Sequence, residues 1–427
     1  MTYEEAITYL HGLLKFGIKP GLERTAELLR RLGNPERRCG RIIHITGTSG
    51  KGSVAAMVEA GLRAAGYRVG LYTSPALERF TERMQINRAE IPREELAGLV
   101  TEVVPHLEAM VAEGHDQLTE FELTTVLAFL WFARLQVDYL VLEVGFGGRY
   151  DTTNVITNPV VTCITNIGLD HTEWLGKTHE AIARDKAGII KPAVPCVTGT
   201  DHPGALEVIR EIALAQDAVL VEVTAADWRV AEFGPAGQLL DLLGGRGWYR
   251  GVELPLLGRH QAANAAVALR VLELAGIGEA EIRRGLAAVI WPGRLELLSR
   301  GEGAPVLLDA AHNPAKCAAL AEAVREYFPG RPVLLVVGAL ADKDVAEMVQ
   351  PLLGLAEQVW TATAESPRRI PAEELAEVCR RFHRRVLVGG TVPEALEAAL
   401  RAAAPSDLVL VTGSFYTVGP ARRHLRG

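Results

Sequence analysis

Residues 41–54 read RIIHITGTSGKGSV, and this stretch decides the fold of the first half of the chain. RIIHIT is short, largely apolar and β-branched, as in a buried strand, and the residues after Lys51 carry apolar side chains at helical spacing. A glycine-rich loop separates the two segments. Strand, glycine-rich loop and helix in this order are the setting in which backbone N–H groups and a helix N-terminus bind phosphate.

The loop supplies the chemistry that a triphosphate needs. Lys51 offers a mobile positive charge for the β- and γ-phosphates, and the glycines let the backbone amides converge. The motif differs from a standard Walker A sequence because Gly52 separates Lys51 from Ser53, which displaces the hydroxyl that normally binds Mg²⁺. Another residue must then take that role. The alternative is an ordinary glycine-rich turn. The candidate nucleotide-binding residues of the loop are Gly47, Thr48, Ser49, Gly50, Lys51, Gly52 and Ser53.

The composition is that of a globular protein of two or three domains. The chain has 427 residues, 48% of them hydrophobic, and a formal net charge of −7, which argues against a general nucleic-acid binder. Its five cysteines form no CxxC pair, so neither a disulfide framework nor a zinc ribbon is expected. The start MTYEEAITYL is acidic where a signal peptide is basic, and no apolar run approaches the ~20 residues of a membrane span. We therefore expect a cytoplasmic protein without membrane association.

Outward from the loop, apolar strands alternate with helices, which predicts an α/β fold with a parallel sheet covered on both faces. A capping box at Thr2 and Glu5 predicts a first helix. The glycine-rich stretch 230–257 predicts either an irregular excursion or a small antiparallel patch. The expected strands of the first part are YRVGLYT (67–73), DYLVLEVG (138–145), VVTCITNI (160–167) and PCVTG (195–199), with helices near 93–113, 119–136 and 179–190.

Trp291–Arg294 reads WPGR, and its Pro-Gly pair predicts a hinge. After it, the strands VLLDAA, VLLVVGAL, VWTATA, RVLVG and LVLVTGS alternate with helices that start near residues 315, 344, 372 and 393. The sequence therefore predicts two domains: residues 1–293 as an ATP-binding, doubly wound, mostly parallel domain, and residues 297–427 as a smaller Rossmann-like α/β domain.

Polar residues follow several expected strands of the first domain. Ser74, Glu143 and the pair Asp170-His171 each come at or just past a strand end, where ligands bind in doubly wound sheets. Hard oxygen ligands suit Mg²⁺. Taken singly, each residue is more simply a solvated or structural side chain, and only their convergence near a phosphate loop indicates a metal site. Lys186, in ARDKAGIIKP, is by itself expected to be a surface lysine.

The second domain has a similar set of polar residues near its strand ends. Arg294 follows the hinge, Asp309, His312 and Asn313 follow the strand VLLDAA, and Ser414 follows LVLVTG. A nucleotide bound between two domains needs contacts from both sides, which these residues offer. The alternative for Asp309 is a helix N-cap, and for His312 a structural histidine.

Nine motifs occur in one order: GTSGKGS (47–53), TSPALERFTERMQIN (73–87), LEVGFGGRYDTTN (142–154), TNIGLDHTEWLGKTHEAIARDKAGIIKP (165–192), LPLLGRHQAANAAVAL (254–269), WPGRLE (291–296), LLDAAHNP (307–314), VVGALADKD (336–344) and LVTGSFYTVG (410–419). In this arrangement the chain resembles the folylpolyglutamate synthase/dihydrofolate synthase family of the Mur ligase superfamily. The resemblance runs from Gly17 to Gly419. Its most specific block is DHTEWLG…KAGIIKP.

The resemblance implies an ATP-dependent ligase. In this family ATP phosphorylates a carboxylate of the folate substrate, and the amine of L-glutamate attacks the acyl phosphate. The matching positions are Gly47–Ser53, Asn264, Arg294 and Asp309 for the nucleotide; Ser74, Glu143 and His171 for Mg²⁺; Lys186 for a carbamate that ligates metal; His312 and Ser414 for the cleft that glutamate enters; and Thr119, Phe121, Asp151 and Thr152 for the pterin pocket. Lys51, Lys186 and His312 are thereby the candidate catalytic residues.

The resemblance also implies small-molecule partners (ATP, a folate or dihydropteroate, and L-glutamate), a monomer, and room for a monovalent cation such as K⁺. Two positions depart from the family pattern: Ala76 replaces a histidine, and Glu120 stands where an apolar or aromatic residue is common. Both border the folate site, so the sequence leaves open whether dihydropteroate is also a substrate. It also leaves open the base that deprotonates glutamate. A Mur-type ligase for another carboxylate and a nucleotide-gated binding protein are the alternative functions.

Overall fold

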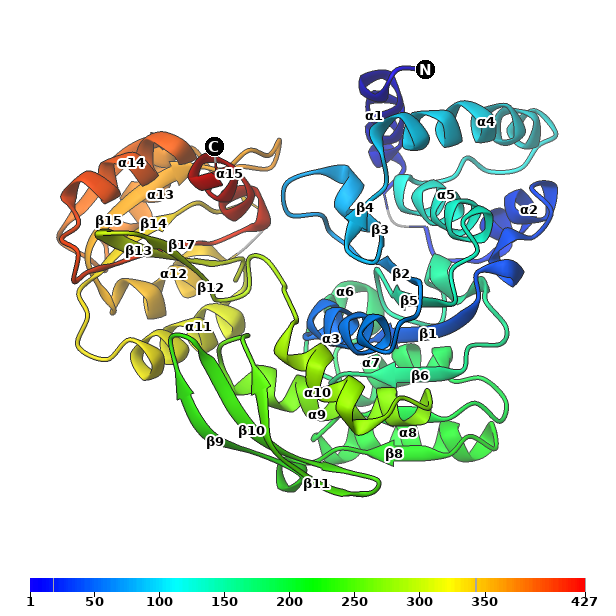
Figure 1. The fold of residues 1–427 in the computed structure, drawn as a ribbon. Helices are drawn as coiled ribbons and strands as arrows, with labels where there is room; N and C mark the ends of the chain where they lie inside the picture. Colours follow the sequence, from blue (N-terminus) through cyan, green and yellow to red (C-terminus); the bar gives the residue numbers. More distant parts are fainter. Residues whose placement is uncertain (18, 342–343, 427) are drawn as a thin grey trace.

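The computed structural model describes residues 1–17, 19–341 and 344–426. Figure 1 shows two lobes side by side, each built on its own sheet, with a small antiparallel sheet beneath the junction between them. The expected α/β class, with a larger, mostly parallel first sheet and a second α/β unit, is confirmed. Asp342 and Lys343 of the VVGALADKD motif lie outside the described residues.

The first sheet has eight strands in the order β4-β3-β2-β5-β1-β6-β7-β8. From β2 to β8 all pairings are parallel, and β3 pairs antiparallel with both β2 and β4. The carboxyl ends of β1, β2, β5 and β6 therefore share one edge. The strands are β1 (Arg41–Thr46), β2 (Val69–Tyr72), β3 (Met84–Ile86), β4 (Ala89–Glu90), β5 (Tyr139–Glu143), β6 (Val161–Ile164), β7 (Cys196–Thr198) and β8 (Leu220–Glu222).

Helices cover both faces of this sheet. One hydrophobic core joins α3, α9, α10 and the small antiparallel sheet to one face, and another joins α1, α2, α4 and α5 to the other. The capping box expected at Thr2 and Glu5 is present. The helices of this lobe are α1 (Tyr3–Gly12), α2 (Glu23–Arg31), α3 (Lys51–Ala64), α4 (Arg93–Ala112), α5 (Glu120–Arg134), α6 (Thr172–Leu175), α7 (His179–Lys186), α8 (Pro203–Ala215), α9 (Arg259–Leu274) and α10 (Glu279–Ala287).

Of the two interpretations of residues 230–257, the antiparallel patch is the correct one. It is a three-stranded sheet of β9 (Trp228–Gly234), β10 (Gly237–Gly244) and β11 (Gly247–Leu254). Two tight connections explain why it forms, because only the turns at 235–236 and 245–246 separate its strands. The apolar face of β10 packs into the core beneath α9.

The second lobe holds a six-stranded sheet in the order β12-β13-β17-β14-β15-β16, parallel except for β12. All of its strands lie beyond residue 295. The division of the chain into domains at 1–293 and 297–427 stays a prediction. Its elements are β12 (Glu296–Arg300), β13 (Gly303–Asp309), β14 (Val333–Val337), β15 (Ala356–Thr363), β16 (Val386–Thr391), β17 (Leu408–Thr412), α11 (Pro314–Tyr327), α12 (Val345–Leu353), α13 (Ala372–Arg380), α14 (Val392–Ala402) and α15 (Phe415–Arg426).

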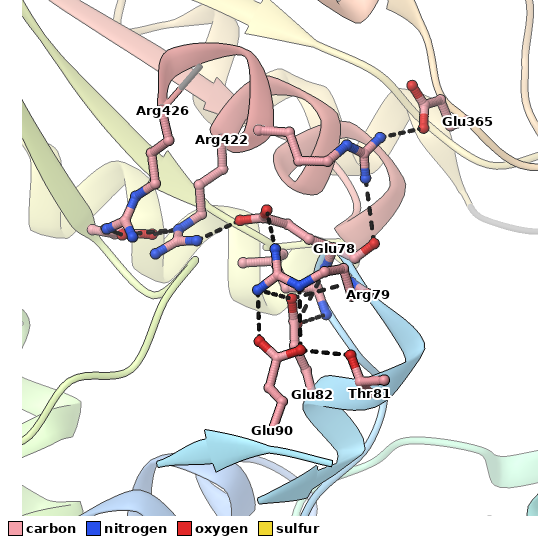
Figure 2. A network of polar contacts seen from close by, with 11 residues as sticks. Glu78, Arg79, Thr81, Glu82, Glu90, Glu365, Arg422 and Arg426 are labelled. Atoms are coloured by element: carbon pink, nitrogen blue, oxygen red, sulfur yellow. Dashed lines mark hydrogen bonds and ion pairs between the residues drawn. The ribbon is translucent and has the colours of Figure 1, made fainter. Parts of the chain in front are cut away.

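The loop after β2 connects the lobes. Leu77 packs against the core of the second lobe, and the neighbouring Glu78 pairs with Arg422 of α15. The same guanidinium donates through Nε to both oxygens of Glu296, at 3.0 and 2.9 Å. Figure 2 shows this network, with Arg422 reaching toward Glu78 from α15. The loop that leads from the strand-end edge of the first sheet is thus anchored on the second lobe.

Within the described ranges 1–17, 19–341 and 344–426, no helix combines the length and the apolar character needed to cross a bilayer.

Candidate functional site

The loop between β1 and α3 is held open by side chains that follow β6. Asn166 accepts the N–H groups of Thr48 and Ser49, with its carbonyl at 3.0 Å and its Oδ1 at 2.8 Å. Thr165 donates its hydroxyl to the carbonyl of Ser49 at 2.5 Å. The strand, loop and helix predicted from the sequence are therefore present, and the carboxyl end of the neighbouring strand fixes the loop's shape.

Two loop glycines are required by close approaches. Gly50 has a φ of +81°, and a Cβ there would collide with the side chain of Asn264 on α9. A Cβ on Gly52 would lie 2.6 Å from the ring of Trp291. The structure therefore places Asn264 beside the loop, while its role as a nucleotide contact, which the resemblance implies, stays a prediction. Ser53 faces away: it is buried in α3, where its hydroxyl accepts from Gln261 at 3.2 Å.

Two lysines meet at one backbone oxygen. The Nζ atoms of Lys51 and Lys186 donate to the carbonyl of Gly47 at 3.0 and 2.9 Å. Lys186 is only 4% exposed, so the expectation of a surface lysine is wrong. The reason is tertiary: a Cβ on Gly148 would lie 2.8 Å from the Cα of Lys186, so the turn after β5 presses directly onto the end of α7.

Burial gives this amine unusual chemistry. It lowers the pKa of Lys186 to about 7, and the positive charge of Lys51 acts in the same direction. A large share of the amine is thus neutral near pH 7. A neutral amine is the form that adds CO₂, so the structure is compatible with the carbamate that the family resemblance implies.

The predicted metal residues are partly brought together. Ser74 donates its N–H to Oε2 of Glu143 at 3.1 Å, and Glu143 is 4% exposed at the end of β5. Burial raises the pKa of Glu143 to about 7, against the opposing charge of Lys51 and the Ser74 amide. A cation beside this carboxylate would offset the cost of its burial. The His171 side chain is 53% exposed, with Nε2 3.9 Å from Asp170.

Among the described residues, no group of three His, Cys, Asp or Glu side chains is placed to hold a metal ion. This does not conflict with the predicted set, which has one carboxylate, one imidazole and one hydroxyl. Mg²⁺ commonly uses one or two carboxylates and completes its shell with substrate phosphates and water. The oxygen-rich edge beside the phosphate loop fits such an ion.

The second lobe presents Arg294 and Asp309 close together. Burial lowers the pKa of Arg294, while the charge of Asp309 opposes this shift. Asp309 accepts the N–H groups of Leu295 and Ala311, both at 2.9 Å. The alternative of Asp309 as a helix N-cap is wrong, because Asn313 caps α11. Asp309 instead fixes the turn after the hinge.

Side chains that follow β13 and β17 lie near one another. The ring of His312 is 5.7 Å from that of Phe415, over which Arg294 also lies, at 4.7 Å. Nδ1 of His312 is 2.8 Å from the carbonyl of Ala310. Ser414 is 1% exposed, and its hydroxyl lies 2.8 Å from that of Thr417, which in turn donates to Gly338.

Sequence reasoning did not identify Lys316. Its Nζ lies 3.1 Å from Nε2 of His312. The sequence did hold a signal for this contact. His312 and Lys316 are four positions apart at the start of a helix, a spacing that places two side chains on one face.

The residues predicted to line the pterin pocket make defined contacts within the first lobe. Thr119 caps α5 in a capping box with Glu122. Phe121 packs on the backbone of Gly145, just past the end of β5. Asp151 accepts from the N–H groups of Phe146 and Thr153, at 2.8 and 3.0 Å.

Two further residues border this region. Thr152 is buried in the short 3₁₀ segment Thr152–Val155. The unusual Glu120 has a partner: Arg83 donates to it at 2.8 Å, and both side chains are largely buried. The departure from the family pattern therefore introduces a buried ion pair rather than a lone charge.

Comparisons with known proteins agree with this architecture. The Mur ligase middle domain matches residues 45–272, and the Mur ligase glutamate ligase domain matches residues 293–415. The dihydrofolate synthase/folylpolyglutamate synthase of Bacillus subtilis is 38% identical over 99% of this chain and 99% of its own.

Two solved structures are similar over nearly the whole chain. Mycobacterium tuberculosis folylpolyglutamate synthase, complexed with ADP and AMPPCP, has a TM-score of 0.89 and 35% identity, covering 100% of this chain and 99% of its own. Escherichia coli FolC, in complex with DHPP and ADP, has a TM-score of 0.86 and 33% identity, covering 100% and 98%.

Proposed function

Since the chain belongs to the folylpolyglutamate synthase/dihydrofolate synthase family of Mur ligases, we propose that it joins L-glutamate to a carboxylate of a reduced folate at the expense of ATP. The nucleotide is a co-substrate. The relatives of known structure hold ADP, AMPPCP or DHPP, which supports a nucleotide and a folate-type molecule as the small-molecule partners.

The phosphate loop is the proposed triphosphate site. Its amides, Lys51 and the N-terminus of α3 supply positive potential, and Asn264, Arg294 and Asp309 supply contacts from α9 and the second lobe. Ser74, Glu143 and His171 would hold Mg²⁺, with Lys186 beside them as a carbamate. When bound, Mg²⁺ neutralises the charge on the phosphate oxygens. A monovalent cation such as K⁺ and a monomeric state stay predictions.

The chemistry proceeds in two steps. A carboxylate oxygen of the folate attacks the γ-phosphorus, the bond to the bridging oxygen breaks, and ADP leaves with that bonding pair. The resulting acyl phosphate is attacked at its carbonyl carbon by the neutral amine of L-glutamate, and phosphate leaves as the amide forms. Because the first step brings two anions together, Lys51 and the loop amides are needed at the transition state.

Enclosure between the lobes protects the acyl phosphate from water. The loop anchored by Leu77 and Glu78 supports this role, since it runs from the strand-end edge of the first sheet to the core of the second lobe. Thr119, Phe121, Asp151 and Thr152 would border the pterin ring. His312 and Ser414 belong to the side from which glutamate enters.

The observation that carries the proposal is the meeting of Lys51 and buried Lys186 at the carbonyl of Gly47, beside buried Glu143. An ordinary glycine-rich turn has no need of two lysines that share one carbonyl, nor of a buried carboxylate at the end of the neighbouring strand.

Phosphate release from ATP tests the proposal. Release that requires both tetrahydrofolate and L-glutamate supports it. Release that requires dihydropteroate and L-glutamate adds the dihydrofolate synthase activity that the relatives' names include. Release that needs neither substrate, or that needs a different carboxylate, would contradict the folate assignment. Nucleotide binding without any release would indicate a binding protein.

A further inference from the structure

Lys316 lies where the two lobes meet. It is in the first turn of α11, half-buried, and the charges that act on it come from both lobes: Asp170 and Lys51 from the first, Arg294 and Asp309 from the second. Its ammonium is thus within electrostatic reach of the phosphate loop, although its helix belongs to the second lobe.

His312 holds this ammonium in place. Because a carbonyl only accepts hydrogen bonds, the contact of 2.8 Å between Nδ1 and Ala310 O makes Nδ1 the donor and leaves a lone pair on Nε2. Lys316 donates one N–H to that lone pair at 3.1 Å. An ammonium carries three N–H donors, so two remain directed elsewhere.

Lys316 forms no ion pair with a carboxylate in residues 1–17, 19–341 and 344–426, although the charges of Asp170 and Asp309 act on it from a distance. The pKa of Lys316 is lowered to about 8, mainly by burial; the charge of Asp170 opposes this shift, and the charges of Lys51 and Arg294 support it. A partly buried cation without a counter-ion is costly, and an anionic ligand relieves that cost.

Resting on the proposed ligase activity, we propose that Lys316 binds a carboxylate of the incoming L-glutamate and is a substrate-binding residue of the second lobe. Glutamate is the one substrate that must arrive after the triphosphate has taken the amides around Lys51. It brings two carboxylates and an amine that must face the acyl phosphate. A cation on the opposite lobe, oriented by His312, can hold one carboxylate while the amine points toward the phosphate loop.

Steady-state kinetics of the full-length protein with Lys316→Met and Lys316→Arg test this assignment. A hydrogen bond to a charged group is worth roughly 10- to 100-fold in affinity, so Lys316→Met should raise KM for glutamate by about that factor, with KM for ATP and tetrahydrofolate unchanged. Lys316→Arg should restore part of the loss. The matched control is Arg325→Met, which removes an exposed cation at the far end of α11 and should change none of the three constants.

Substrate analogues add a readout that a structural role would not change. Replacing one glutamate carboxylate by an amide, in L-glutamine or L-isoglutamine, should raise KM for the wild type. One of the two analogues lacks the carboxylate that Lys316 holds. For that analogue, the Lys316→Met variant should have the same KM as for L-glutamate. A rise in KM for ATP instead of glutamate would overturn the inference and make Lys316 a phosphate contact. So would an unchanged glutamate KM in an active variant. Absence of turnover by the wild type would refute the proposed function itself.

Discussion

Replacing Arg422 by methionine tests how the lobes are joined. The side chains of Arg422, Glu78 and Glu296 are 8%, 4% and 13% exposed, so the substitution leaves two carboxylates buried without their shared cation. Removing one partner of a buried ion pair costs about 3–5 kcal/mol. Arg79, 3.2 Å from Glu78, and Arg426, 3.4 Å from Glu296, offer partial replacement, which favours the lower end, about 3 kcal/mol.

Thermal unfolding followed by circular dichroism measures the effect. For a domain of roughly 150–250 residues, a loss of 1 kcal/mol in the free energy of unfolding lowers Tm by about 2–4 °C. A loss of about 3 kcal/mol in Arg422→Met should therefore lower Tm by about 6–12 °C. The adjacent Arg423 gives a matched control, because it pairs with Glu365 at the surface, where the side chains are 42% and 55% exposed. Exposed pairs contribute about 0–1 kcal/mol, so Arg423→Met should change Tm by less than about 4 °C.

A double variant separates charge burial from lost packing. In Arg422→Met/Glu78→Gln one of the two stranded carboxylates becomes neutral, so part of the lost stability should return. The loop after β2, which contains Glu78, borders the candidate folate site, and Arg422→Met should therefore also raise KM for tetrahydrofolate. Equal Tm values for the Arg422 and Arg423 variants would refute the argument that this buried network stabilises the junction.

The remaining predictions concern the site itself. Lys51→Ala should reduce phosphate release at least about 100-fold while circular dichroism shows an intact fold, since it removes a transition-state charge; near-normal turnover would contradict its role. Glu143 has a folded pKa of about 7, above its ordinary 4.5, so the folded state holds the extra proton between these values and stability falls as pH rises through that window. Glu143→Gln should therefore be inactive, yet without metal at pH 8 it should be more stable than the wild type by at most about 3 kcal/mol in denaturant titration. This difference in the free energy of unfolding should close as the pH falls toward 4.5. An unchanged stability at pH 8 would be evidence against the buried charge. Lys186 should appear as a carbamate in the electron density of a Mg²⁺–ATP crystal, and full-occupancy ammonium density would count against it. Glu120→Gln leaves Arg83 without its charge partner and should alter the ratio of kcat/KM for dihydropteroate and tetrahydrofolate, with KM for ATP unchanged as the control; an identical ratio would exclude a part for this pair in substrate choice.

Local patterns were enough to predict much of the architecture. RIIHIT and the glycine loop have clear strand, turn and helix signals, and the rule that ligands bind at strand ends singled out Glu143 and Ser74, which contact each other and whose role as metal ligands stays a prediction. The strands β3, β4 and β8 were not predicted because two or three residues are too few to establish a period of two.

Long-range packing accounts for what the sequence did not reveal. Whether Lys186 is buried depends on how the turn after β5 packs on α7, and no local pattern reports that contact. Glu78 and Arg422 are 344 positions apart, so only the folded chain brings them together. Asp309 resembled a helix cap because a helix follows, whereas Asn313-Pro314 places the cap four residues later.

The shared carbonyl of Gly47 links ligand binding at Lys51 to the protonation state of Lys186. Lys51 lowers the proton affinity of Lys186 while both contact that oxygen. Any ligand that draws Lys51 toward itself alters this repulsion, and thermodynamic reciprocity requires that the state of Lys186 alter the affinity for that ligand in return. If Lys186 carries the predicted carbamate, CO₂ and the adenine nucleotide would therefore be heterotropic effectors of each other, and the CO₂ content of the buffer would be a variable in nucleotide-binding isotherms.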